Sequence, residues 1–185
     1  MKLSSLLRGV VLMVAGVLLS AVVSANELGI SLDELSERLS TDPSQLIFID
    51  VRDPVEIMFV GFTDAVDANV PYLLVDRNEW DESKERFKMN RNEDFVAQIK
   101  AALAEKGLPD SALIVTMCRS GSERGMPSAK YLRDNGFEQA RFLEHGFQGD
   151  AIKEGAQKGL RLVNGWQNAG KPWQKKPNGQ KIFKP

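Results

Sequence analysis

Short apolar runs alternate with amphipathic segments through most of the chain. Four apolar runs have the length of β-strands, and they cover residues 46–51, 68–72, 112–117 and 139–143. Apolar residues recur at helical spacing in the remaining periodic segments, which are residues 31–40, 92–107, 127–135 and 148–157. Strands that alternate with helices predict an α/β fold, in which a parallel sheet is covered on both faces and joined by right-handed crossovers.

Two of the predicted helices carry clear signals at their ends. Ser31 and Glu34 have the spacing of a capping box, so we expect a helix to begin directly after Ser31. Another begins with Pro127 near its start and has Gly136 just past its end, which is the usual placement of these two residue types.

Charged residues of both signs crowd residues 76–91. Such a mixture is typical of a solvated surface, and we predict a solvated helix or a long loop here. The segment is interpreted as a surface insertion, because added length in a loop costs little free energy. A lid over a functional site is the alternative.

The N-terminal end differs from the rest in composition. Residues 9–23 form an apolar run with one polar residue, basic residues precede it, and small residues lead up to Ala25. This pattern predicts a secretory signal peptide over residues 1–25, a mature chain that begins at Asn26, and export to a periplasm without stable membrane association. An uncleaved anchor is the alternative, but the run is shorter than the roughly 20 residues that span a bilayer.

The C-terminal end is basic and rich in turn residues. We expect residues 171–185 to form a loose tail, so that the predicted domain covers residues 26–170. Trp166 and Trp173 bring a large apolar area to this region, and we expect them to pin the terminal segment onto the body of the domain. Closure of a substrate cleft is the alternative role for the two rings.

Composition and charge narrow the functional classes. The 185 residues are 43% hydrophobic and 26% charged with a formal net charge of −1, as in an ordinary soluble domain. No clustered basic face is visible, so we expect no nucleic-acid partner. One cysteine and one histidine allow neither an intramolecular disulfide nor a structural zinc site, and we expect no metal and no cofactor.

The single cysteine, Cys118, follows a predicted strand and precedes a predicted helix. Backbone N–H groups of a tight loop and a helix N-terminus both favour an anion, and they therefore favour a thiolate over a thiol. We expect Arg119 and Arg124 to add positive charge at the rim, while Gly121 and Gly125 permit a tight turn. The polar residues after the cysteine argue against burial in a core, so a nucleophile is the hypothesis and a small buried core residue the alternative.

Polar side chains also end a second predicted strand. Asp50 and Arg52 lie at the end of the apolar run that begins at residue 46. Ligand sites in parallel sheets gather at such strand ends. We expect the Asp50 carboxylate to accept hydrogen bonds from the backbone of neighbouring loops.

Three stretches resemble motifs of the rhodanese-type sulfurtransferases. Residues 118–121, Cys-Arg-Ser-Gly, are followed by an arginine and a helix and are similar to the active-site loop of that family. Residues 49–56 are similar to its early strand and turn. Residues 136–137 together with 142–147 are similar to the strand and turn that follow its active-site helix.

The resemblance covers residues 30–170. It implies a three-layer α/β/α fold around a central, mostly parallel five-stranded sheet. One departure is the pair Gly61-Phe62, where the family usually has Gly-His, and this change is expected to remove a polar group from the rim of the site.

The resemblance implies sulfur transfer through Cys118. In the family the thiolate takes the sulfane sulfur of an anionic donor such as thiosulfate, holds it as a persulfide, and passes it to a thiophilic acceptor. Such a donor and acceptor are the expected partners. The residues expected to bind the donor are Arg119, Ser120, Gly121, Ser122, Glu123, Arg124 and Gly125.

Two alternatives stay open. Five residues separate Cys118 from Arg124, one more than in many rhodaneses, and this spacing resembles that of phosphatases with a rhodanese fold. The longer loop would admit a phosphate ester or arsenate, whereas the Arg-Ser-Gly sequence and Met117 in place of a histidine favour sulfur transfer. A non-catalytic module that carries sulfur or binds a partner is the second alternative.

Overall fold

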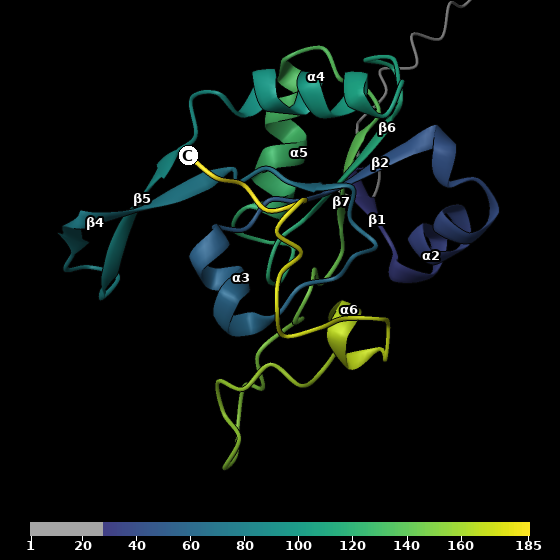
Figure 1. Ribbon diagram of the computed structural model, residues 1–185. Coiled ribbons are helices and arrows are strands. Elements are labelled where there is room, and N and C mark those ends of the chain that lie inside the picture. The colour runs from purple at the N-terminus through teal and green to yellow at the C-terminus, as the bar shows by residue number, and fades with distance from the viewer. Residues whose placement is uncertain (1–27) are drawn as a thin grey trace, which may run out of the picture.

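A five-stranded parallel sheet organises the computed structural model, which describes residues 28–185 (Figure 1). The strand order is β1-β7-β6-β2-β3, and every neighbouring pair is parallel. The predicted signal peptide and the expected mature start at Asn26 lie outside the described residues. The strands of this sheet are β1 (Gly29–Ile30), β2 (Leu46–Asp50), β3 (Ala68–Asn69), β6 (Leu113–Met117) and β7 (Ala140–Leu143).

Helices cover both faces of the sheet, which confirms the predicted α/β fold (Figure 1). α4 and α5 lie on one face, where Ile99 and Leu132 belong to one apolar cluster. α2, α3 and α6 lie on the other face, where Leu35 and Ile57 belong to a second cluster. The helices are α2 (Leu32–Thr41), the short 3-10 helix η1 (Pro43–Gln45), α3 (Pro54–Val60), α4 (Phe95–Glu105), α5 (Gly125–Asp134) and α6 (Gly165–Asn168).

The central strand β2 follows from an apolar run, residues 46–49, that ends in Asp50. All five of its residues are buried, as expected for a strand between two helical layers. In the register with β6, Leu46 lies opposite Leu113 and Asp50 lies opposite Met117. This register brings the carboxyl end of β2 beside Cys118, the residue that follows β6.

Local end signals set the helix boundaries. The Ser31 hydroxyl accepts a hydrogen bond from the Glu34 N–H at 3.1 Å, which confirms the capped start of α2. Helix α4 lies within the predicted range 92–107. Helix α5 begins at Gly125, two residues earlier than predicted, because a proline such as Pro127 is tolerated in the first turn of a helix.

Residues 76–91 form part of an antiparallel hairpin, so the predicted helix or loop is wrong. Strands β4 (Leu73–Asp81) and β5 (Arg86–Arg91) pair, and the rings of Trp80 and Phe87 meet with centroids 5.3 Å apart. Lys88 and Glu79 form an ion pair at 2.5 Å across the strands. Pairs of rings and of opposite charges stabilise such a ribbon, and they depend on a strand pairing that the mixed charge pattern does not reveal.

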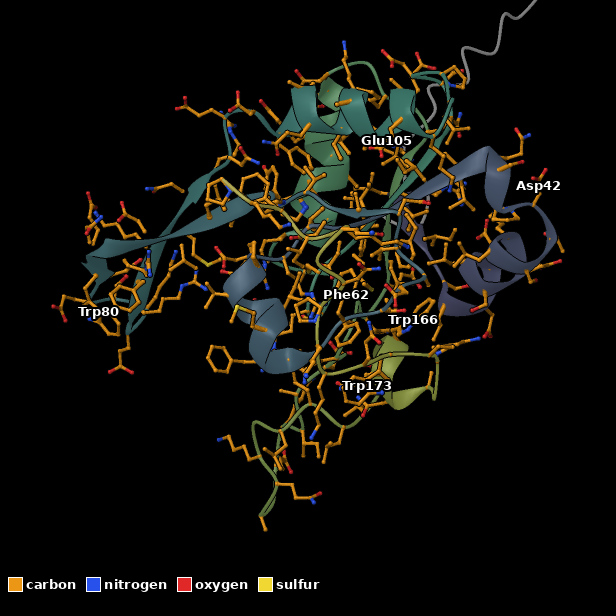
Figure 2. All side chains as sticks on the ribbon, viewed as in Figure 1. Asp42, Phe62, Trp80, Glu105, Trp166 and Trp173 are labelled. Carbon is orange, nitrogen blue, oxygen red and sulfur yellow. The ribbon has the colours of Figure 1, made fainter. Side chains whose placement is uncertain are left out.

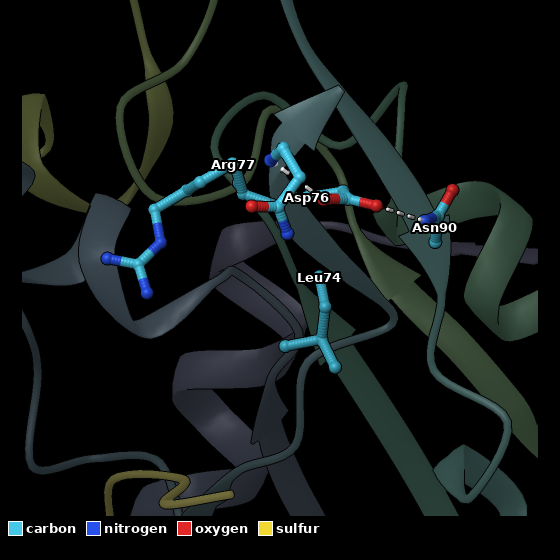
Figure 3. Close-up of a pocket in the computed structure, with 6 residues that line it drawn as sticks. Leu74, Asp76, Arg77 and Asn90 are labelled. Carbon is cyan, nitrogen blue, oxygen red and sulfur yellow. Dashed lines mark hydrogen bonds between the residues drawn. The ribbon is translucent and has the colours of Figure 1, made fainter. Parts of the chain in front are cut away.

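A cavity of about 500 Å³ lies against this hairpin (Figure 3). The Asn90 side-chain amide donates to the Asp76 carboxylate at 3.3 Å, and the Arg77 side chain extends to the other side (Figure 3). No residue of the Cys118 loop lines this cavity. Its lining consists of Leu74, Val75, Asp76, Arg77, Asn78 and Asn90.

Residues 148–157 do not form the predicted helix. Gly149 has a φ of +82°, which interrupts a right-handed helix. The chain instead folds back on itself, and the Ile152 N–H donates to the Leu160 carbonyl at 2.8 Å. The resulting 150–164 loop extends from the body of the domain next to α6 (Figure 1).

Residues 171–185, expected to form a loose tail, lie against the domain (Figure 1). Phe62 and Gln174 form an antiparallel bridge with N–H to oxygen distances of 2.8 and 2.7 Å. The Lys181 ammonium donates to two backbone carbonyls in residues 64–66, at 2.7 and 2.8 Å. These partners lie more than 100 residues earlier in the chain, so no local pattern predicts them.

The prediction that tryptophan pins the terminal segment is confirmed for Trp166. Its ring is 3% exposed, and its indole N–H donates to the Pro172 carbonyl at 2.9 Å. Phe62, Trp166 and Trp173 lie close to one another below the sheet, whereas Trp80 lies apart on the hairpin (Figure 2). Phe62 is fully buried, so the pair Gly61-Phe62 places no side chain of this residue at the surface.

Candidate functional site

The residues predicted for the site form one continuous loop at the carboxyl end of β6. Residues 118–124 connect β6 to α5, and Gly125 is the first residue of that helix. Asp50 ends the neighbouring strand β2 and pairs with Met117. The loop therefore lies at the edge of the sheet where parallel strands end, which is the usual place of a ligand site.

The sulfur of Cys118 is enclosed by its own loop. Its Sγ accepts a hydrogen bond from the Gly121 N–H at 3.2 Å, and Gly121 has a φ of +84°. A Cβ on Gly125 would lie 3.4 Å from the sulfur. Cys118 is consequently 1% exposed, so the expectation that its polar flanks keep it unburied is wrong for the side chain. The backbone belongs to the loop while the sulfur faces inward.

Several backbone donors of the loop are unused. Five N–H groups have no acceptor within the described part of the chain, and they belong to Arg119, Ser120, Ser122, Glu123 and Arg124. Successive free N–H groups in a tight loop form a concave surface that favours an anion.

The segment of residues 146–149 holds the carbonyl groups of the loop. The Phe147 N–H donates to the Cys118 carbonyl at 2.8 Å, and the next two N–H groups donate to the Arg119 carbonyl at 2.8 and 3.1 Å. Gly146 has a φ of +57°, and a Cβ there would overlap the Cys118 carbonyl oxygen. Only glycine fits this close approach of two backbones.

Arg124 is buried, so the expectation that it adds charge at the rim is wrong. The residue is 3% exposed, and its Nη1 donates to Oε2 of Glu56 in α3 at 2.6 Å. Burial alone lowers the pKa of this guanidinium, but the Glu56 carboxylate outweighs it and the pKa of Arg124 lies above its ordinary value. The ion pair draws the side chain inward. The Arg124 Nε and the Glu56 Oε1 are buried without a partner among the described residues.

Glu123 connects the loop to the hairpin. Its carboxylate forms an ion pair with Arg86 of β5 at 2.5 Å. The hydrogen bond from Arg86 holds the pKa of Glu123 below its ordinary value, and the same bond raises the pKa of Arg86. The charged insertion therefore contacts the candidate site directly.

Arg119 is the loop arginine that is exposed at the rim. Its Nε donates to the Gln148 side-chain oxygen at 2.8 Å. Partial burial lowers the pKa of Arg119, and the nearby charge of Arg161 lowers it further. The hydroxyl groups of Ser120 and Ser122 lie 3.1 Å apart in the same loop.

A buried ion pair supports the loop from the end of β2. The predicted backbone hydrogen bond to Asp50 is confirmed, since the Arg52 N–H donates to its carboxylate at 3.0 Å. The Arg52 guanidinium, which the sequence did not indicate as a partner, also contacts Asp50 at 2.6 Å with both side chains fully buried. It lies 4.2 Å from the centroid of the Phe147 ring, so the pair joins β2 to the segment that holds Cys118.

Three residues that shape the site had no role assigned from the sequence. They are Glu56, Arg86 and Gln148. Glu56 falls within the motif of residues 49–56, but its partner Arg124 lies 68 residues later. Opposite charge is the only sequence signal of such pairs, and it does not single out one glutamate among many.

Residues 28–185 contain no group of three or more His, Cys, Asp or Glu side chains that could hold a metal ion. None of the described helices is both long enough and apolar enough to cross a membrane.

Fold and loop together define a class of protein: an α/β domain that presents one cysteine between a central strand and a helix. The sequence matches the Rhodanese-like domain family over residues 31–152, more than half of the chain. The chain therefore belongs to the rhodanese-like domain family.

Two solved structures are similar to this chain. Rv0390 from M. tuberculosis is 25% identical with a TM-score of 0.59, over 80% of this chain and 97% of that one. A rhodanese-related protein from Thermoplasma volcanium is 16% identical with a TM-score of 0.44, over 80% of this chain and 98% of that one. No curated protein matches the sequence.

Proposed function

We propose that this protein is a sulfurtransferase that moves a sulfane sulfur from a small anionic donor such as thiosulfate, through a Cys118 persulfide, to a thiophilic acceptor. The observation that carries the proposal is the 3.2 Å hydrogen bond from the Gly121 N–H to Sγ, in a loop whose other donors are unused. Such donors stabilise first a thiolate and then the negative outer sulfur of a persulfide.

The chemistry takes two displacement steps. In the first, the Cys118 thiolate attacks the sulfane sulfur of thiosulfate, the S–S bond of the donor breaks, and sulfite leaves with the electron pair. In the second, the acceptor thiolate attacks the outer sulfur, the S–S bond to Cys118 breaks, and the electron pair returns to Sγ. Charge balances in each step, so no external oxidant or reductant is required.

The two loop arginines take different roles in this proposal. Arg119 is exposed and would bind the oxygens of the donor, since guanidinium groups suit oxyanions. Arg124 is held by Glu56 and would act as a positioning residue that keeps positive charge close to the sulfur. Its role is thus to support the loop, with no direct contact to the donor.

The length of the loop, seven residues from Cys118 to Arg124, supports a second candidate, a phosphatase or arsenate reductase of rhodanese fold. In that chemistry Arg124 would bind the oxyanion, and it would first have to leave Glu56. The 1% exposure of Cys118 favours a small donor over a bulky phosphate ester. These two observations favour sulfur transfer.

The test is an intact-mass measurement after incubation with thiosulfate. We expect a gain of one sulfur atom that cyanide reverses, and no gain in the Cys118→Ser variant, which has no other cysteine. A protein that gains no sulfur but hydrolyses a small aryl phosphate, with that activity lost in Cys118→Ser, would establish the second candidate instead.

We further propose that the protein works in a periplasm after removal of residues 1–25, with a small donor and acceptor as its partners. The support is the composition of that segment. N-terminal sequencing of the periplasmic fraction should find Asn26, whereas intact residues 1–25 in a membrane fraction would contradict export by cleavage.

A further inference from the structure

An open groove of about 820 Å³ lies beside the Cys118 loop. Ser120 and Ser122 of the Cys118 loop line it, and they flank Gly121, whose N–H contacts the sulfur. The other lining residues belong to the 150–164 loop. The complete lining is Ser120, Ser122, Asp150, Ala151, Ile152, Lys153, Arg161 and Val163.

The cations of this groove have no carboxylate partner. Lys153 and Arg161 line it and form no ion pair within residues 28–185, and the same holds for Arg119 at the adjoining rim. Asp150 is the one acidic residue in the lining, and its carboxylate accepts a hydrogen bond from Asn164 at 2.9 Å and lies 2.9 Å from Nδ1 of His145. The hydrogen bond from Asn164 lowers the pKa of Asp150 and the nearby charge of Arg161 lowers it further, so this carboxylate offsets part of the positive charge. Two cations against one carboxylate leave the lining with a net positive charge for a ligand.

The groove also has apolar walls, and its volume is larger than a small inorganic donor requires. Ile152 and Val163 contribute carbon surface, and Val163 is 58% exposed. A volume of about 820 Å³ falls in the range of sites for small organic molecules. Thiosulfate or cyanide would occupy only a small part of it.

We infer that this groove binds the sulfur acceptor, and that the acceptor is a low-molecular-weight thiol that carries carboxylate groups. The inference rests on the proposed sulfurtransferase function. The carboxylates would meet Arg161 and Lys153, and the carbon chain would lie against Ile152 and Val163. A persulfide adds an outer sulfur about 2 Å from Sγ, and in this proposal the acceptor thiolate attacks that sulfur from the side of the groove.

Electrostatics at the rim agrees with an anionic acceptor. Burial lowers the pKa of Arg119, and the positive charge of Arg161 lowers it further. Two guanidinium groups that repel each other in this way are both stabilised when a carboxylate binds next to them.

The experiment compares three acceptors on protein first loaded with thiosulfate. Mercaptosuccinate is the dicarboxylate thiol, 2-mercaptoethanol the neutral thiol, and cyanide the small acceptor. The measured quantity is the rate at which mercaptosuccinate removes the persulfide sulfur, divided by the rate with cyanide. We expect Arg161→Gln and Lys153→Gln each to lower this ratio about tenfold, because each variant removes a charge-assisted contact. The matched control is Lys158→Gln, an exposed lysine of the same loop outside the groove lining.

The outcomes separate the two proposals. If the persulfide forms but the ratio of the mercaptosuccinate rate to the cyanide rate is the same in the native protein and both variants, the groove is not the acceptor site. If no persulfide forms, the sulfurtransferase proposal and the acceptor role fail together. Arg161 also contacts the Gly149 carbonyl, so Lys153→Gln, which removes no hydrogen bond within the described residues, keeps the test valid if Arg161→Gln misfolds.

Discussion

The ion pair between Glu56 and Arg124 is expected to stabilise both the loop and the fold. The perturbation is Glu56→Gln, which keeps the shape of the side chain and removes its charge. The Arg124 side chain is only 4% exposed, and in the Glu56→Gln variant it would lose the Glu56 carboxylate that lies 2.6 Å away. No other carboxylate forms an ion pair with Arg124 among the described residues, so its charge would stay buried and uncompensated.

The expected loss follows from the burial of each partner. Removal of one member of a fully buried pair costs about 3–5 kcal/mol. The Glu56 side chain is 21% exposed, so water can enter when the charge is removed, and the glutamine oxygen can still accept a hydrogen bond. We therefore expect a loss of about 2 kcal/mol, or a decrease in Tm of about 4–8 °C for a domain of this size.

The assay is equilibrium unfolding in urea, with the free energy of unfolding compared between variants. The matched control is Glu79→Gln, which removes an ion pair of similar length whose side chains are 49% and 54% exposed, and its free energy of unfolding should not change measurably. A double-mutant cycle with Arg124→Gln should give a coupling energy of about 1–2 kcal/mol. Equal stability of Glu56→Gln and the control would refute the assigned role of this pair.

Two further predictions concern the supports of the loop. Gly146→Ala should lower the free energy of unfolding by about 2–5 kcal/mol, because a Cβ at this positive φ would also overlap the Cys118 carbonyl. Gly155 has a positive φ and open space around it, so Gly155→Ala should lower the free energy of unfolding by only about 1–2 kcal/mol. Equal losses in the two variants would contradict the overlap. Arg86→Gln should lose at most about 1 kcal/mol at pH 7, because its pair with Glu123 is 36% and 46% exposed. The pKa of Glu123 is lowered from 4.5, so this stabilisation is present above pH 4.5 and disappears as the pH falls through the folded-state pKa. Urea unfolding at several pH values measures it, and a difference in the free energy of unfolding between the native protein and Arg86→Gln that persists at lower pH would contradict the ion pair.

The sheet could be predicted from the sequence because its signals are local. The run of residues 46–51 is apolar except for Asp50 and has the length of a strand buried between two helical layers, and β2 occupies nearly all of it. Ser31 and Glu34 set the start of α2 through contacts three residues apart. The position of Cys118 at the end of β6 follows from the same kind of local pattern.

The contacts of the site could not be predicted because they join distant segments. Glu56 and Arg124 lie 68 residues apart, and nothing near either residue specifies the other. The hairpin depends on cross-strand pairs such as Trp80 with Phe87, which appear only when the two strands are aligned. The helix expected over residues 148–157 failed because the sequence pattern alone does not show which glycines adopt a positive φ.

The two segments that differ most from the sequence-based expectation both meet the candidate site. The hairpin reaches the loop through Arg86 and Glu123, and the 150–164 loop forms the outer walls of the groove beside Ser120. The parallel sheet and the loop N–H groups fix the sulfur, which is the part of the chemistry that the family fold can supply. In the proposed sulfur transfer, the choice of donor and acceptor would depend on the residues around the Cys118 loop, and the two segments supply the Arg86 contact and most of the groove lining. Substrate selection should therefore follow the sequence of the hairpin and the 150–164 loop more closely than that of the sheet.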